Sequence, residues 1–296
     1  MNRIAALVMA VALGSVASGC GGDVGSAGAT SSATPTPTET VSPTPSATPS
    51  VSPSPTASGS PAATPTPLPS QQVECGGPVV YGVDVSDLEG PNIDWAAAKA
   101  AGLGFAWMKA TQGTTFVATT FAGNWSRSKA AGVRRGAYHF FNPTLDGVAQ
   151  ANAFLAAVGP LDPDDLPPAL DIECPDGDPE CLGYVGGSGT APASAIAARA
   201  HDFLTTVQAA TGRVPVVYTF VSYFSSNGLD TTGLADDTLW IANYGVSCPD
   251  IPAPWSAARF WQYDYLGSVT GVSNSVDVDI FFGTPADLAL YAESGG

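Results

Sequence analysis

The residues best suited to do chemistry in this chain are acids that lie within otherwise apolar, strand-like runs. They occur in three separate runs and are Asp84, Asp171, Glu173, Asp277 and Asp279. Because side chains alternate between the two faces of a strand, Asp171 and Glu173 share one face, as do Asp277 and Asp279. A charged group in an apolar strand is costly to bury unless it has a partner or a function. This pattern predicts a cluster of carboxyl groups that forms a site.

Carboxyl groups held close together can carry out glycoside hydrolysis. Like charges raise the proton affinity of one member, which then stays protonated near neutral pH and can protonate a glycosidic oxygen. A second, ionised carboxylate stabilises positive charge at the sugar carbon or orients the attacking group. Two alternatives stay open: any single acid could cap a strand end, and an oxygen-only cluster could bind calcium or magnesium. We favour the hydrolase and expect neither a metal nor another cofactor.

Aromatic residues flank the same runs, and their flat apolar faces suit sugar rings. We expect five side chains to bind substrate: Tyr138, Tyr218, Trp240, Tyr244 and Gln262. Some of the aromatic rings could instead belong to the core. His139 is expected to be a structural, hydrogen-bonding residue, and no G-x-S-x-G motif precedes a helix to suggest a serine hydrolase.

The segments that must position these side chains lie in residues 75–296, where strand-like and helix-like segments alternate. Strands are predicted at residues 79–85, 105–111, 136–141, 169–174, 214–220, 238–244, 258–264 and 276–282. Helices are predicted at residues 94–101, 121–131, 147–158 and 193–211. Alternation of this kind favours a parallel sheet with helices outside, because parallel crossovers need that length. We therefore expect an α/β fold: an irregular TIM-like (β/α) barrel with eight strands and fewer than eight helices, its site at the strand ends. A doubly wound open sheet is the alternative, although no G-x-G-x-x-G motif follows the first strand.

The first 74 residues are expected to lie outside this domain. Residues 1–19 resemble a bacterial export signal, whose apolar stretch is too short to span a bilayer. The small residues before Cys20 resemble a lipoprotein processing site, so Cys20 would carry a lipid anchor; an ordinary signal peptide with an incidental cysteine is the alternative. Residues 20–74 are rich in Ser, Thr and Pro, cannot form a core, and are expected to be an extended tether.

Charge and cysteine usage restrict the partners and the compartment of residues 75–296. This part holds 9 basic and 23 acidic residues, a net charge of −14, so it should repel nucleic acid. Its four cysteines are Cys75, Cys174, Cys181 and Cys248. An even number in an exported domain suggests two disulfides, for which three pairings are possible. We favour Cys174 with Cys181, which bracket a turn-rich loop, and this choice leaves Cys75 to pair with Cys248.

An ordered series of motifs between residues 81 and 283 resembles glycoside hydrolase family 25, the Chalaropsis-type lysozymes. The motifs are GVDVS at 82–86, IDW at 93–95, KATQG at 109–113, Phe121 with Asn124, GAYHF at 136–140, DIE at 171–173, WIA at 240–242 with Tyr244, WQY at 261–263 and VDVD at 276–279. Each motif is weak alone, but their order along the chain is specific. Two positions depart from the family pattern: Gln112 stands where Glu is common and Ala118 where Asp is frequent, and we expect altered loop packing from them.

The resemblance implies an N-acetylmuramidase that acts on the β-1,4 bond between N-acetylmuramic acid and N-acetylglucosamine. It implies Glu173 as the general acid and Asp84, Asp171 and Asp277 as the other catalytic carboxylates, with Tyr138 lining the cleft. The acetamido group of the substrate would attack the sugar carbon, and Asp171 would orient it. The residues by themselves support only a carboxylate glycosidase, and the muramidase assignment comes from the family.

These inferences combine into one expectation for the whole chain. We expect a monomeric enzyme that is exported, anchored to a bacterial membrane through Cys20 or secreted, and active on peptidoglycan glycan strands. Two alternatives stay open: a non-catalytic lipoprotein that binds the cell wall, and a glycosidase of another N-acetylated polysaccharide.

Overall fold

The computed structural model describes residues 75–173, 193–224, 231 and 233–296. The predicted export signal and tether, and the favoured bridge between Cys174 and Cys181, lie outside the described residues. In the described part of the chain, every helix is either too short or too polar to cross a lipid bilayer.

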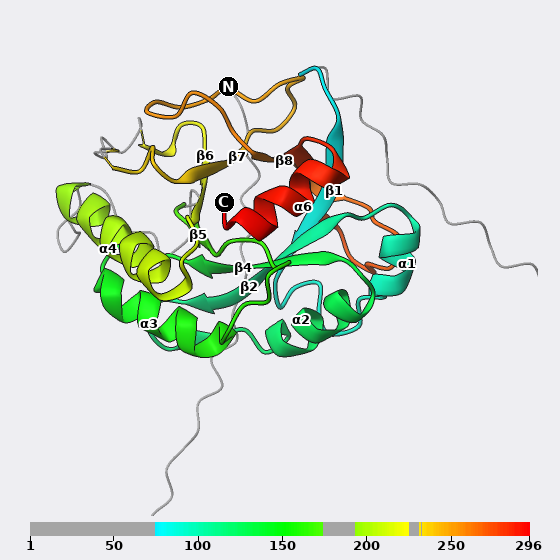
Figure 1. Cartoon of the computed structure of the whole chain (residues 1–296), viewed down its shortest axis with the longest axis horizontal. Helices are drawn as coiled ribbons and strands as arrows, with labels where there is room; N and C mark the ends of the chain where they lie inside the picture. Colours follow the sequence, from blue (N-terminus) through cyan, green and yellow to red (C-terminus); the bar gives the residue numbers. More distant parts are fainter. Residues whose placement is uncertain (1–74, 174–192, 225–230, 232) are drawn as a thin grey trace, which may run out of the picture. The chain divides into compact units, whose positions relative to one another are not determined.

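Eight strands close into a barrel, and a ninth short strand is added at its edge (Figure 1). The strands found in the described residues are β1 (Val79–Val85), β2 (Phe105–Gln112), β3 (Phe116–Val117), β4 (Arg134–Phe140), β5 (Ala169–Asp171), β6 (Val216–Phe220), β7 (Thr238–Ala242), β8 (Phe260–Gly267) and β9 (Val276–Phe282). Their order is β1-β9-β8-β7-β6-β5-β4-β2, and pairing of β1 with β2 closes the ring. β3 pairs only with β2, in the antiparallel direction. The predicted eight-stranded barrel is confirmed.

The last strand runs against the others, which differs from the expected parallel sheet. β9 is antiparallel to both of its neighbours, β8 and β1, whereas the pairs around the rest of the ring are parallel. The reason lies in the connection between β8 and β9, which consists of residues 268–275 only. A parallel crossover needs a dozen or more residues, so the chain must turn back directly.

Four helices cover the outside of the barrel, and one closes an end of it (Figure 1). The helices of the described residues are α1 (Trp95–Ala100), α2 (Phe121–Ala130), α3 (Gly147–Val158), α4 (Ala193–Thr211) and α6 (Pro285–Ser294). The first four lie where helices were predicted. α6 was not predicted, although its signals are present: Thr284 and Asp287 form a capping box, and Gly295 ends the helix in the left-handed conformation.

The barrel strands separate two hydrophobic cores, because successive side chains point inward and outward in turn. In β2, Phe105 and Trp107 point into the barrel, whereas Ala106 and Met108 pack with the outer layer. The interior core is rich in aromatic rings, and α6 closes it at the start of the parallel strands. Its members are Val80, Phe105, Trp107, Tyr138, Leu166, Ala169, Val216, Tyr218, Trp240, Ala242, Phe260, Phe281, Leu288, Tyr291 and Ala292. The other end of the barrel therefore remains for the acids.

A glycine makes room for each of two interior rings. A Cβ atom at Gly82 would lie 2.3 Å from the Phe105 ring, and one at Gly136 would lie 2.3 Å from the Trp107 ring. Both distances are far below van der Waals contact. These two glycines, each within an otherwise bulky strand, allow the aromatic interior to fill the barrel.

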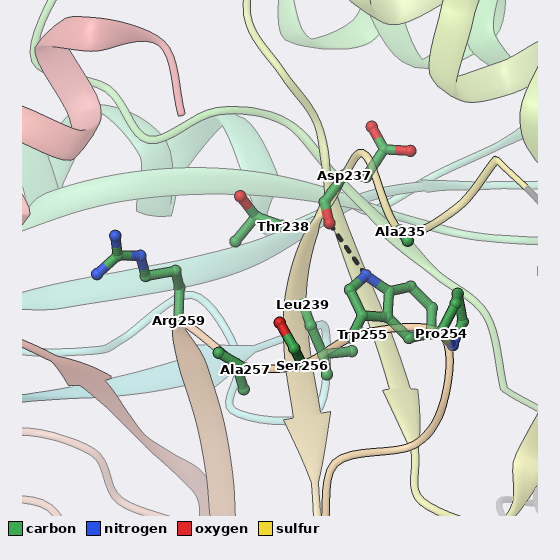
Figure 2. A pocket seen from close by; sticks show the side chains of 10 residues that line it. Ala235, Asp237, Thr238, Leu239, Pro254, Trp255, Ser256, Ala257 and Arg259 are labelled. Atoms are coloured by element: carbon green, nitrogen blue, oxygen red, sulfur yellow. Dashed lines mark hydrogen bonds between the residues drawn. The ribbon is translucent and has the colours of Figure 1, made fainter.

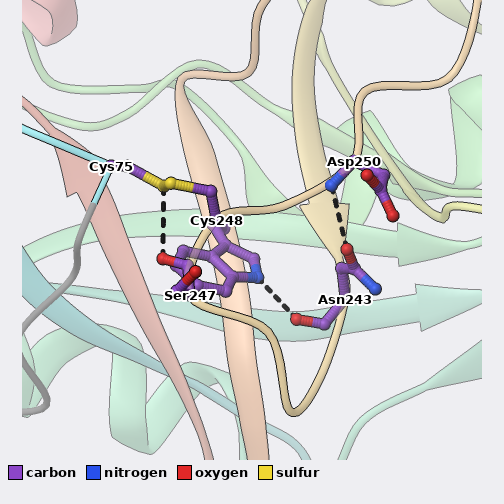
Figure 3. Close-up of a disulfide and its surroundings, with 6 residues drawn as sticks. Cys75, Asn243, Ser247, Cys248 and Asp250 are labelled. Atoms are coloured by element: carbon purple, nitrogen blue, oxygen red, sulfur yellow. Dashed lines mark hydrogen bonds between the residues drawn. A yellow bond between two sulfur atoms is a disulfide. The ribbon is translucent and has the colours of Figure 1, made fainter.

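A disulfide joins Cys75, just before β1, to Cys248, in the loop after β7 (Figure 3). The two Cα atoms are 5.1 Å apart, and the cysteines are separated by 173 residues in the sequence. This pairing, which was expected once Cys174 was assigned to Cys181, is confirmed. The same loop is held by Asn243, whose side-chain oxygen accepts from the Asp250 amide at 2.9 Å.

Removal of this bridge is expected to lower the thermal stability of the domain. A cross-link over so long a segment restricts the unfolded chain, and loss of a native disulfide from an exported domain costs on the order of 2–5 kcal/mol. Thermal unfolding of the Cys75→Ala/Cys248→Ala double variant should therefore begin at a temperature lower than that of the unmodified protein. An unchanged unfolding temperature would show that the bridge does not constrain the domain.

Candidate active site

The acids predicted to form the site gather at one end of the barrel, where the parallel strands end. Asp84 lies near the end of β1, and Asp171 is the last residue of β5. Glu173 follows two residues later. Asp277 lies near the start of β9 and is the direct cross-strand partner of Asp84. The reversed direction of β9 is what brings Asp277 to the same end as the others.

Mutual electrostatic effects show that these carboxyl groups lie close together. Burial raises the pKa of Asp171 well above its usual value, and the charges of Glu173, Asp84 and Asp277 raise it further. Burial, followed by the charge of Asp84, raises the pKa of Asp277 to about 9. The pKa of Asp84 is raised to about 7, mainly by burial. Such a cluster keeps protons at neutral pH, as general acid catalysis requires.

Gln262 of β8 holds the Asp84 carboxyl group in place. Its Nε2 donates a hydrogen bond of 2.6 Å to Asp84 Oδ2. Its Oε1 accepts from the hydroxyl of Tyr218, at 2.9 Å, and from the hydroxyl of Tyr244. Because two phenol groups occupy the amide oxygen, the amide nitrogen must face Asp84. Three strands or strand ends thus cooperate to fix one carboxyl group.

Stacked aromatic rings form the floor beneath the carboxyl groups. Trp240 stacks on Trp107 with ring centres 5.2 Å apart. The rings of Tyr218 and Tyr138 pack against Trp240 in T-shaped geometry, with ring centres 4.7 and 6.3 Å from that of Trp240. The Trp240 Nε1 donates to Asp279 Oδ1 at 2.8 Å. This apolar floor excludes water from below, which explains why burial dominates the pKa shifts above it.

The sequence model of the glycosyl hydrolases family 25 matches residues 83–272. The chain belongs to glycosyl hydrolase family 25. Lysozyme M1 of Streptomyces globisporus is 37% identical to it over 219 residues, which cover 73% of this chain and 72% of that protein. The N,O-diacetylmuramidase of a Chalaropsis species is 34% identical over 210 residues, 67% of this chain and 96% of that enzyme. The crystal structure of the bacterial lysozyme from Streptomyces coelicolor superposes with a TM-score of 0.67 and 35% identity, covering 75% of this chain and all of that one.

Membership of family 25 confirms the prediction of a glycoside hydrolase with a TIM-like barrel. The individual roles of Glu173, Asp84, Asp171 and Asp277 remain predictions, although the structure brings all four to one end of the barrel. Among the described residues, no group of three or more histidine, cysteine or acidic side chains has the arrangement of a metal site.

The five side chains expected to bind substrate differ in their exposure. Tyr244 is 40% exposed at the rim of the family 25 site, and its ring contacts Tyr265 with centres 5.0 Å apart. Tyr138, Tyr218, Trp240 and Gln262 are instead buried in the barrel floor or behind Asp84. Of the five, Tyr244 therefore presents the largest surface to a ligand, and the part that each of them plays in substrate binding remains a prediction.

Two charged residues near the site received no role from the sequence. Lys109 donates to Gln112 Oε1 at 2.8 Å. Its positive charge offsets part of the rise in the pKa of Asp171. Glu89 raises the pKa of Asp84 by its charge. Lys109 lies in one of the family 25 motifs, which could have drawn attention to it. Glu89 lies in a loop with no pattern, so only the three-dimensional structure reveals its position.

His139 is confirmed as a structural residue on the outer face of β4. Its Nε2 lies 3.1 Å from Gln150 Oε1, which also accepts from the Asn142 amide, so this nitrogen carries the hydrogen. Its Nδ1 then accepts from the Thr111 hydroxyl at 2.7 Å. Burial lowers the pKa of His139 to about 4, and the ring stacks on Phe203. A neutral, fully bonded imidazole is unsuited to act as a base.

A hollow of about 540 Å³ lies at the other end of the barrel, at the starts of β7 and β8 (Figure 2). It is lined by Asp237, Trp255 and Arg259, among others, and the Trp255 indole donates to the Asp237 carbonyl at 3.0 Å. The charged ends of Asp237 and Arg259 point away from the indole ring (Figure 2). The carboxyl cluster is at the opposite end of the barrel, so this hollow is separate from the candidate active site.

Proposed function

We propose that this family 25 hydrolase cleaves the β-1,4 bond between N-acetylmuramic acid and N-acetylglucosamine in peptidoglycan. The observation that carries the proposal is the meeting of Asp84, Asp171, Glu173 and Asp277 at one end of the barrel, with raised pKa values at the three aspartates. The printed names of the relatives, a lysozyme and an N,O-diacetylmuramidase, support peptidoglycan as the substrate.

In the proposed reaction, Glu173 donates its proton to the glycosidic oxygen as the bond to the sugar carbon breaks. The acetamido oxygen of the substrate attacks that carbon, and Asp171 orients the acetamido group and stabilises its developing charge. Glu173, now ionised, then removes a proton from the water that opens the cyclic intermediate. Asp84, held by Gln262, stabilises positive charge around the sugar ring in its ionised form, and Asp277, whose pKa is about 9, acts there as a neutral acid that can donate a hydrogen bond.

We also propose that the enzyme is exported and held to a bacterial membrane as a monomer through Cys20. The Cys75–Cys248 disulfide supports export, because such bridges persist in oxidising compartments. Residues 20–74, rich in Ser, Thr and Pro, would then let the domain reach the cell wall. Metabolic labelling with a radioactive fatty acid should mark the full chain and leave the Cys20→Ala variant unlabelled. Equal labelling of the two chains would contradict a lipid anchor at Cys20.

Incubation with purified peptidoglycan tests the proposed reaction. The enzyme should release new reducing sugar ends from the glycan. Binding to peptidoglycan without any release would favour the non-catalytic lipoprotein. Release from chitin-like polymers, but not from peptidoglycan, would favour the glycosidase of another N-acetylated polysaccharide.

A further inference from the structure

Asp279 is a second acid of β9 that lies deeper in the barrel than the four site carboxyl groups. Its side chain is fully buried, with 0% exposure. In the sheet, it is the cross-strand partner of Gly82 on β1 and of Gln262 on β8. Gly82 has no side chain, and Asp84 is the next residue of β1 on the same face. Asp279 therefore lies directly beneath Asp84 and beside the glutamine that holds it.

The hydrogen bonds of Asp279 fit the neutral acid better than the carboxylate. Its Oδ1 accepts from Trp240 Nε1 at 2.8 Å. Its Oδ2 is buried and receives no N–H or O–H hydrogen from the described residues. An ionised carboxylate with a single donor in an apolar barrel is strongly disfavoured. Accordingly, burial and the charge of Asp84 raise the pKa of Asp279 well above its usual value.

A protonated Asp279 needs an acceptor, and Asp84 is the group that it faces. A hydrogen bond from Asp279 to Asp84 lowers the pKa of Asp84 and raises that of Asp279, as expected when the proton stays on Asp279. Asp84 then receives one hydrogen bond from Gln262, at 2.6 Å, and one from Asp279. The two donors come from different strands and leave one defined orientation for the carboxylate.

We propose that Asp279 is a positioning residue that keeps its proton, donates a hydrogen bond to Asp84, and so favours the ionised form of Asp84 and aligns it at the site. This role rests on the proposed function for its effect on hydrolysis. Its effect on Asp84 itself does not depend on that function and is tested separately below.

Other titratable groups also act on this pair and must be held constant in a test. Those that act on Asp279 or Asp84 through charge or hydrogen bonding, or respond to them, are Glu89 of the loop after β1, Asp171 of β5, Asp277 of β9, and the phenols of Tyr138, Tyr218, Tyr244 and Tyr263. Glu173 acts on Asp171 and Asp277. Substitutions at Asp279 leave all of them in place.

Two substitutions that keep the branched outline of the aspartate side chain separate the loss of its charge from the loss of its hydrogen bonds. In Asp279→Asn, the amide oxygen can accept from Trp240 and the amide nitrogen can donate to Asp84, so both bonds are kept. In Asp279→Leu, the branched outline of the side chain is kept, with two bulkier methyl groups in place of the oxygens, and both bonds are lost. The asparagine variant therefore imitates a protonated aspartate, and the leucine variant does not.

The experiment measures kcat/KM for peptidoglycan hydrolysis against pH, together with the titration of Asp84 by carbon NMR in the same proteins. Asp279→Asn should remain within about threefold of the unmodified enzyme. Asp279→Leu should lose about tenfold or more, and the acidic limb of its profile and the pKa of Asp84 should move up by about one pH unit. Thermal unfolding checks that each variant is folded.

The outcomes distinguish this inference from the proposed function. A folded Asp279→Asn variant that loses as much activity as Asp279→Leu, or in which the pKa of Asp84 moves by a full unit, would overturn the inference. If the leucine variant fails to fold, the asparagine variant alone tests the inference, through its kcat/KM and through the pKa of Asp84. If the unmodified protein releases no reducing ends, the proposed function fails, and the NMR titration still tests the hydrogen bond.

Discussion

Replacement of Glu173 by glutamine is expected to abolish the release of reducing ends from peptidoglycan while the fold stays intact. Glutamine has nearly the same shape as the acid but cannot donate a proton to the glycosidic oxygen. General acid catalysis contributes about 10²–10⁴-fold to a rate, so kcat/KM should fall by that order. The measurement is reducing-sugar release, with circular dichroism as the check of the fold.

Glu293→Gln provides the matched control for this variant. Glu293 is an exposed acid on α6, at the opposite end of the barrel, and the chemical change is identical. Its activity should equal that of the unmodified enzyme. If Glu173→Gln keeps full activity, the assignment of the general acid is wrong, even if other members of the cluster are catalytic.

The folded domain is expected to be more stable at pH 5 than at pH 8. The pKa values of Asp84 and Asp277 in the folded state are about 7 and about 9, above the usual value of 3.8. Between pH 4 and 9 the folded state thus binds more protons than the unfolded state, and stability falls as the pH rises through this window. Thermal unfolding at the two pH values measures the difference, which should reach several degrees.

Asp277→Asn tests whether the cluster causes this dependence. The variant removes one acid that the folded state must otherwise neutralise, so its unfolding temperature should rise at pH 8 and change little at pH 5. Asp202→Asn, on the exposed side of α4, removes a carboxyl group remote from the cluster. Its unfolding temperature should equal that of the unmodified protein at both pH values. A domain whose stability rises between pH 5 and 8 would contradict the raised pKa values.

Much of the fold was predictable because the strands are apolar on both faces and the helices begin and end with clear signals. β1 and β9, as well as α3 and α4, have the predicted bounds. The direction of β9 was not predicted, because the strand pattern is the same in either direction and only the short connection decides it. β3 escaped prediction because a two-residue, exposed strand carries no pattern. α6 has good capping signals, but it follows the last strand and so lies outside the alternating pattern of strands and helices.

The acids of the site were predictable because alternation along a strand places each pair on one face. The depth of each acid in the barrel was not predictable, because it depends on the register between strands. Asp277 and Asp279 share a face, yet the register sets one opposite Asp84 and the other opposite Gly82. The role of Gln262 depends on two tyrosines, from other parts of the chain, that donate to its side-chain oxygen. No sequence pattern predicts that these side chains converge.

The reducing ends formed on peptidoglycan provide the most direct test of the carboxyl cluster as a muramidase site. Borohydride reduction of the digested glycan, followed by mass spectrometry, identifies the sugar at each new end. Cleavage of the proposed bond should yield reduced N-acetylmuramic acid from the unmodified enzyme and none from Glu173→Gln. New ends that carry only reduced N-acetylglucosamine, or none at all from the folded, unmodified enzyme, would contradict the account.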